Sequence, residues 1–174
     1  MGARLADALN DGDLDAQLAR AGIETRPATR EDVGFAFETL RESMHDSVAA
    51  AFGGWDDAQQ YALFAPSFDL RTHRVLRLDG ADAGILAVEA HVDRIHLARI
   101  FLRREARRRG LGGRTVRVLL AWAHARDLPL VLTVLRTNPA AQRFYARLGF
   151  EVIGETSTHV HLEAEPAGPI GRIA

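Results

Sequence analysis

The stretch of residues 107–115, RRRGLGGRT, decides how the rest of this 174-residue chain is interpreted. It lies between an apolar run typical of a strand, Ile95–Leu102, and a run typical of a helix, residues 116–126. Glycines let a backbone approach an anion closely, and the amides of a helix's first turn then point at that anion. The neighbouring arginines add forked donors that suit phosphate oxygens. The stretch therefore predicts a phosphate-binding turn at the start of a helix.

The spacing of this stretch excludes two common phosphate motifs. No Lys-Ser/Thr pair follows the glycines, as Walker A requires, and the third glycine of the dinucleotide fingerprint is missing. The form is Arg-x-x-Gly-x-Gly, from Arg107 to Gly112. A second motif follows about one strand downstream at residues 138–150, NPAAQRFYARLGF.

Together the two motifs resemble the GNAT N-acetyltransferase superfamily. The first resembles its acyl-CoA-binding signature, Gln/Arg-x-x-Gly-x-Gly/Ala. The second resembles its other signature, Asn-x-x-Ala-x-x-(aromatic or Leu)-Tyr-x-x-x-Gly-Phe, at every one of these places. The resemblance runs from about Ile23 to about Ala164 and implies an acyltransferase. Such an enzyme moves an acetyl group from acetyl-CoA to a primary amine, here expected on a small molecule, by direct attack in a ternary complex.

The hydrophobic pattern predicts the same element order as that family, βααβββαβαββ. The resemblance implies a mixed α/β fold with a mostly antiparallel sheet of six or seven strands, and a cofactor cleft between two splayed parallel strands. We expect an N-terminal extension at 1–22 with leucines at helical spacing, an acetyltransferase domain at 23–166 and a flexible tail at 167–174. Strands are expected at 23–28, 73–78, 84–90, 95–102, 130–135, 151–154 and 159–163, and helices from about 30, 56, 113 and 139.

Composition limits the remaining possibilities. The chain has no cysteine, no apolar run long enough to span a membrane and no secretory pattern at its start, which favours a cytoplasmic protein of bacterial type. All 22 basic residues are arginines. Eight of them lie between Arg99 and Arg117, against the single acid Glu105. This local cluster favours an anion site over a nucleic-acid surface, which would recruit more of the chain. We expect neither a nucleic-acid nor a membrane partner, and a homodimer stays open.

The resemblance assigns residues to acetyl-CoA. In the family the pantetheine arm pairs with the backbone of the strand before the phosphate turn, and one amide there also faces the acetyl oxygen. On this chain the cofactor-binding residues are Ile100, Leu102, Arg107, Arg108, Arg109, Gly110, Leu111, Gly112, Gly113, Arg114, Thr115, Asn138, Ala141, Arg143 and Tyr145.

Two residues are candidates for proton transfer. Tyr145 matches the family tyrosine near the cofactor sulfur, and its phenol can protonate the leaving thiolate. The alternative is that Tyr145 only packs beside its apolar neighbours. Many relatives place a glutamate on the strand before the turn, where this chain has His96. Histidine can accept a proton at neutral pH. No acid lies between Arg94 and Leu102, so no nearby carboxylate is expected to replace His96, and a water chain without a dedicated base remains open.

In the superfamily the acceptor site is built from the first two helices and the last strands. Acids beside aromatic residues in these segments suit a cationic amine. The expected acceptor residues are Arg41, Glu42, His45, Asp46, Trp55, Asp56, Tyr61, Thr158 and His159.

The seven histidines have no acids or cysteines at ligand spacing, so no metal is expected. Two other functions stay open: a non-catalytic acyl-CoA-binding sensor that lost the family glutamate, and a nucleic-acid-binding protein.

Overall fold

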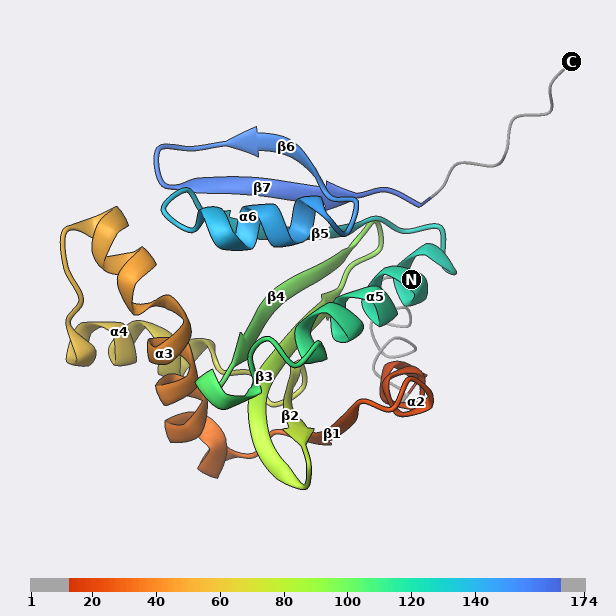
Figure 1. The fold of residues 1–174 in the computed structure, drawn as a ribbon, viewed down its shortest axis with the longest axis horizontal. Helices are drawn as coiled ribbons and strands as arrows, with labels where there is room; N and C mark the ends of the chain where they lie inside the picture. The colour runs from red at the N-terminus through yellow and green to blue at the C-terminus, as the bar shows by residue number, and fades with distance from the viewer. Residues whose placement is uncertain (1–12, 167–174) are drawn as a thin grey trace, which may run out of the picture.

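The computed structural model describes residues 13–166, in which one seven-stranded sheet carries five helices (Figure 1). The helices are α2 (Asp13–Arg20), α3 (Val33–Phe52), α4 (Asp57–Phe64), α5 (Leu111–His124) and α6 (Pro139–Ala146). The strands are β1 (Glu24–Pro27), β2 (His73–Leu78), β3 (Ala81–Ala90), β4 (Ile95–Leu102), β5 (Leu130–Leu135), β6 (Glu151–Glu155) and β7 (His159–Ala164). The expected first half of the N-terminal extension and the expected tail lie outside the described residues.

The strand order is β1-β2-β3-β4-β5-β7-β6, and every neighbouring pair is antiparallel except β4 with β5. The predicted mixed, mostly antiparallel sheet is thus confirmed. Helix α5 begins at Leu111, two residues before the expected start at Gly113. Leu111 is only 1% exposed, and its burial anchors the two poor helix formers that follow it.

Local sequence explains the turns that connect these elements. Asp79 and Gly80 have φ values of 53° and 78°, the left-handed conformation that two-residue hairpins require. Asn138 caps α6 by accepting a hydrogen bond from the Ala141 amide at 3.0 Å. After that helix Gly149 has φ 90°, and the Phe150 amide donates to the Tyr145 carbonyl oxygen at 3.2 Å.

The sheet has a different apolar layer on each face. Helices α2, α5 and α6 cover one face, where side chains such as Leu119, Trp122 and Tyr145 join the larger core. Helices α3 and α4 cover the other face, where Phe37 and Phe64 join the smaller one. Alternate residues of each strand therefore belong to opposite sides of the molecule.

The parallel pair at the centre of the sheet is open along most of its length. Strands β4 and β5 pair only at Ile95 with Leu130 and at His96 with Val131. A register shift in the β3–β4 ladder, between Ala87 and Val88, bends β4 just beyond this point. From there Figure 1 shows β4 turning away from β5 toward α3. One edge of β4 therefore faces no strand after its first two residues.

Helix α2 is packed into the molecule. Leu14 and Leu18, which are 2% and 0% exposed, belong to the larger core.

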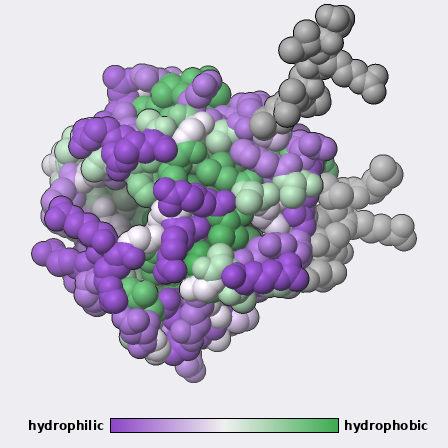
Figure 2. All heavy atoms as spheres, turned by 45° about the vertical axis from the view of Figure 1, so that its right-hand side comes forward, coloured by the Kyte–Doolittle hydropathy of each residue, from purple (hydrophilic) through white to green (hydrophobic). Residues whose placement is uncertain are grey.

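On the face drawn in Figure 2, apolar side chains reach the surface in a central band between hydrophilic ones. None of the helices among residues 13–166 is long and apolar enough to cross a bilayer.

Candidate functional site

The turn before α5 offers three backbone donors. Gly110 precedes the helix with φ 79°, and no side chain caps the helix. Within residues 13–166 the amides of Leu111, Gly112 and Gly113 have no hydrogen-bond acceptor; the Arg114 amide is the first to bond inside the helix, at 3.0 Å to Gly110. Three free N–H groups at the positive end of a helix dipole can hold an anion, and residues 107–115 are named the anion-binding turn for this capacity.

The arginines of this turn have different roles. Arg107 points inward: its Nε donates to the Leu102 carbonyl at 2.9 Å and an Nη to Ser43 Oγ at 3.2 Å. Arg109 pairs with Asp79 in the β2–β3 hairpin at 2.8 Å. Arg108 and Arg114 of the turn and Arg143 of α6 are exposed, and no side chain or carbonyl of residues 13–166 bonds to their guanidinium groups. The same holds for the neighbouring Arg104 and Arg117, so several cations beside the turn are available to an anion.

Several other predicted cofactor residues have apolar or already bonded side chains, so they can offer a ligand little except backbone N–H and C=O groups. The Leu102 carbonyl already accepts the Arg107 and Ser43 hydrogen bonds, so it is not free for a cofactor arm. The Thr115 side chain is fully buried and donates to the Leu111 carbonyl at 2.9 Å, which gives it a packing role. The partly buried side chains of Ile100 and Ala141 pack against the larger core.

Tyr145 lies in the wall formed by α6. It is 7% exposed and makes edge contacts with the rings of Phe144 and Phe150 at 5.0 and 5.3 Å. Burial raises the pKa of the phenol above its ordinary value. The hydroxyl therefore carries its proton at neutral pH, which a general acid requires.

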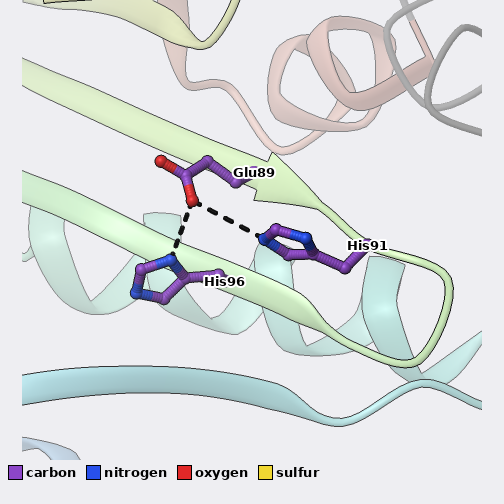
Figure 3. Close-up of side chains that lie close together, drawn as sticks. All are labelled: Glu89, His91 and His96. Atoms are coloured by element: carbon purple, nitrogen blue, oxygen red, sulfur yellow. Dashed lines mark hydrogen bonds and ion pairs between the residues drawn. The ribbon is translucent and has the colours of Figure 1, made fainter. Parts of the chain in front are cut away.

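His96 lies beside a carboxylate that the sequence interpretation missed. Glu89 stands directly opposite it on β3, and the distance from Glu89 Oε2 to His96 Nδ1 is 3.0 Å (Figure 3). His91 Nε2 is 3.6 Å from the same oxygen. The expectation that no carboxylate lies near His96 is therefore wrong, because the acid comes from the neighbouring strand and not from the same one.

The same contact corrects the argument about metals. The histidines have no acid at ligand spacing along the chain, but the fold brings nitrogen and oxygen atoms of Glu89, His91 and His96 within 4.8 Å of one another. That reason for expecting no metal fails, and the expectation itself stays a prediction.

Tyr145 and His96 belong to opposite faces of the sheet. Tyr145 and Leu132 both belong to the larger core. His96 is in register with Val131, which lies on the other face of β5. Since β4 and β5 separate just after His96, a molecule lying between them can meet one residue on each face.

Two pockets on the α3–α4 side contain most of the expected acceptor residues. A mainly apolar one is lined by Met44, Val48, Phe52, Trp55, Leu63 and Leu135, with Asp56 and His159. A polar one is lined by Arg41, Glu42, His45, Asp46, Trp55 and Asp57, and reaches Arg107 and Asn138. Tyr61 and Thr158 line neither: Tyr61 stacks edge-on against Phe37, and Thr158 bonds to His159.

The acids of the polar pocket are already engaged by partners in the chain. Glu42 accepts from Arg103 and from the Arg104 amide, both at 3.0 Å. Asp57 accepts from Trp55 Nε1 at 2.7 Å and from Arg41 at 3.3 Å. The attraction expected for a cationic amine is correspondingly weaker than the sequence suggested.

The sequence matches the model of one enzyme family. The model of the acetyltransferase (GNAT) family matches residues 41–150, which include both sequence motifs, the second part of α3, the separated strands and the anion-binding turn. The chain belongs to this family. It is therefore an acyltransferase, and the predicted family and enzyme class are confirmed.

Solved structures support the fold of this acetyltransferase. PaiA N-acetyltransferase from Thermoplasma acidophilum, in complex with coenzyme A, is 18% identical with a TM-score of 0.66, and the match covers 82% of this chain and 98% of that chain. The ribosomal-protein-S18-alanine N-acetyltransferase from Escherichia coli is 20% identical with a TM-score of 0.61, covering 87% and 98%. An acetyltransferase from Thermus thermophilus is 18% identical with a TM-score of 0.63, covering 82% and 96%.

Proposed function

We propose that this acetyltransferase moves the acetyl group of acetyl-CoA to a primary amine of a small molecule, by direct attack in a ternary complex. The observation that carries the proposal is the opening between β4 and β5 with an uncapped helix end beside it. The PaiA N-acetyltransferase structure contains coenzyme A, which supports the choice of cofactor.

The donors present fit acetyl-CoA. Its pyrophosphate needs clustered N–H groups and cations, which the amides of residues 111–113 together with Arg108 and Arg114 supply. A Cβ at Gly112 would meet only Leu102 Cδ1 at 3.4 Å, so internal packing does not demand glycine there. Close approach of a ligand does explain it. The open edge of β4 after His96 offers backbone groups to an amide-containing arm.

The two candidate catalytic side chains divide the proton transfers. Bound acetyl-CoA supplies a thioester carbonyl carbon; the C–N bond forms there as the C–S bond breaks. His96 takes the proton that the amine loses, and the Tyr145 phenol donates one to the leaving sulfur. Both side chains then exchange protons with solvent. Since they lie on opposite faces of the sheet, the amine enters from the α3–α4 side and the sulfur leaves toward α6.

One continuous strip of the sheet leads from the apolar pocket to His96. On β5 the same face carries Val131, Thr133 and Leu135, and their partners on β7 are Glu163, His161 and His159. Leu135 and His159 line the apolar pocket, while Val131, Thr133 and His161 line a hollow that contains His96. An acceptor with an apolar group can therefore lie along this strip with its amine at His96.

The non-catalytic sensor is the second candidate considered from the sequence, and it rested on the missing family glutamate. Glu89 now provides a carboxylate 3.0 Å from His96. This observation removes the main argument for a domain without turnover.

The cofactor assignment is tested at Gly112. We expect acetyl-CoA to raise the melting temperature of the wild type by mass action, and Gly112→Glu to abolish that rise because a carboxylate fills the phosphate approach. The control is Gly34→Glu, at an exposed glycine of α3 with nothing within 4 Å of an added Cβ. An unchanged melting shift in Gly112→Glu contradicts the proposed binding turn.

The acceptor is identified in a second experiment, which measures the release of free CoA from acetyl-CoA with a panel of primary amines.

A further inference from the structure

Glu89 and His96 form a cross-strand pair whose geometry is fixed by the sheet. Their Cα atoms are in register between β3 and β4, and Glu89 Oε2 lies 3.0 Å from His96 Nδ1. Both side chains are partly exposed, at 42% and 32%. They lie on the face that carries the strip leading to the apolar pocket. The pair is therefore accessible to a molecule on the acceptor side.

The pair determines which nitrogen of His96 is available. An ionised carboxylate only accepts hydrogen bonds, so the Nδ1 atom facing it carries the hydrogen. The other nitrogen, Nε2, then has a free lone pair, and it lies on the far side of the ring from Glu89 (Figure 3). A neutral imidazole in this tautomer is ready to accept a proton at Nε2.

The surroundings keep Glu89 ionised. Partial burial alone would raise the pKa of Glu89, but the hydrogen bond from His96 and the charges of His96 and His91 lower it overall. The carboxylate therefore stays negative at neutral pH, where it also stabilises the positive charge that forms when His96 takes a proton.

We propose that Glu89 is a positioning residue that holds His96 in the Nδ1–H tautomer and stabilises its protonated form during acetyl transfer. The inference rests on the proposed function, since it assigns to His96 the amine proton. Through His96, a carboxylate on β3 serves the role that relatives give to a glutamate on β4. Glu89 and His96 are in register on neighbouring strands, so a carboxylate on either strand can lie beside the acceptor amine.

Several other charged groups surround the pair and enter any pH profile. Arg99 on β4 and His73 on β2 interact with the negative charge of Glu89. His91 lies on the turn between β3 and β4. The remaining groups line the hollow beside His96: Asp93, Arg94, His161 and Glu163.

The test is a double-mutant cycle with Glu89→Gln and His96→Ala. The assay measures free CoA release with acetyl-CoA and the best amine of the panel. We expect Glu89→Gln to lower kcat/KM about 10-fold to 100-fold without changing the KM for acetyl-CoA. The acidic limb of the kcat/KM profile moves to lower pH, because the imidazolium loses its neighbouring negative charge. In the His96→Ala background, Glu89→Gln has no further effect.

Each leg of the cycle has a distinct meaning. If His96→Ala leaves rate and pH profile unchanged, the base role fails and the inference fails with it. If His96→Ala lowers the rate but Glu89→Gln does not, or if the two effects add, only the inference is overturned. The control Glu24→Gln removes an acid that pairs with Arg77 on the far edge of the sheet, and it tests for a general effect of charge.

A second measurement needs no acceptor. In protein labelled with ¹⁵N in its imidazole rings, the His96 resonances, assigned by their loss in His96→Ala, report the tautomer directly. We expect the Nδ1–H form in the wild type and a mixture in Glu89→Gln, because an amide can present either its oxygen or its nitrogen to the ring. The same tautomer in both proteins overturns the inference.

Discussion

At the scale of single residues, the motifs correctly predicted how helix α6 begins and ends. Asn138 caps its helix, and Gly149 takes the left-handed conformation that ends it. Such features depend on a few neighbouring residues, so the sequence contains the information. Glu89 could not be found in the same way. Its contact with His96 depends on the register between β3 and β4. The register of this pair shifts between Ala87 and Val88, and no local sequence pattern predicts that shift.

The arginines of the anion-binding turn show the same limit. The sequence assigns all of them to phosphate, since each is close in the chain to the glycines. In the structure Arg107 turns inward to Leu102 and Ser43, and Arg109 pairs with Asp79. The direction of a long side chain depends on partners from distant segments, which spacing does not reveal.

Tyr145 gives the sharpest prediction at this scale. Tyr145→Phe keeps the ring that packs between Phe144 and Phe150 but removes the only proton donor of that side chain. We expect turnover to fall by about 10²-fold or more. The melting shift caused by acetyl-CoA should stay close to that of the wild type, which separates catalysis from binding. Unchanged turnover would make Tyr145 a packing residue.

At the scale of elements, hydrophobic periodicity located each strand boundary to within one residue, except that β3 begins at Ala81 and not at Gly84. Each strand has its own apolar pattern and turn residues, so this information is local. The separation of β4 from β5 is not visible in either strand alone. We expect it to depend on how β3 holds β4, and Gly84 on β3 is in register with Leu102 at the end of β4. A Cβ at Gly84 would lie 2.4 Å from the Phe101 carbonyl oxygen and 2.6 Å from Leu102 Cδ2.

Gly84→Ala therefore tests whether β3 positions the open part of β4. The added methyl must displace the backbone at Phe101, and overpacking of this kind costs about 1–3 kcal/mol. We expect a lower melting temperature and a smaller acetyl-CoA melting shift than in the wild type. Gly34→Ala is the matched control, since an added Cβ there meets nothing within 4 Å. A normal shift in Gly84→Ala would mean that the position of β4 tolerates this displacement.

At the scale of the whole molecule, the proposed boundary after residue 22 separates α2 from the acetyltransferase domain, and the structure gives α2 several ties to that domain. Asp13 accepts from Trp122 Nε1 at 3.0 Å and pairs with Arg126, both near the end of α5. Asp15 pairs with Arg74 on β2. Helical spacing predicted the helix, but sequence could not show where its apolar side would pack.

Leu18 tests whether α2 is part of the folding unit. Its side chain is 0% exposed in the larger core, so Leu18→Ala should leave a cavity and cost about 2–5 kcal/mol. Urea unfolding should show one transition at a lower midpoint, because the loss is shared by the whole domain. The control is Leu63→Ala on α4, where the leucine is 67% exposed and truncation should change stability by less than about 0.5 kcal/mol. If Leu18→Ala unfolds with the wild-type midpoint, α2 is an appendage and the boundary after residue 22 stands; a shifted single transition places α2 inside the domain that forms the acetyl-transfer site.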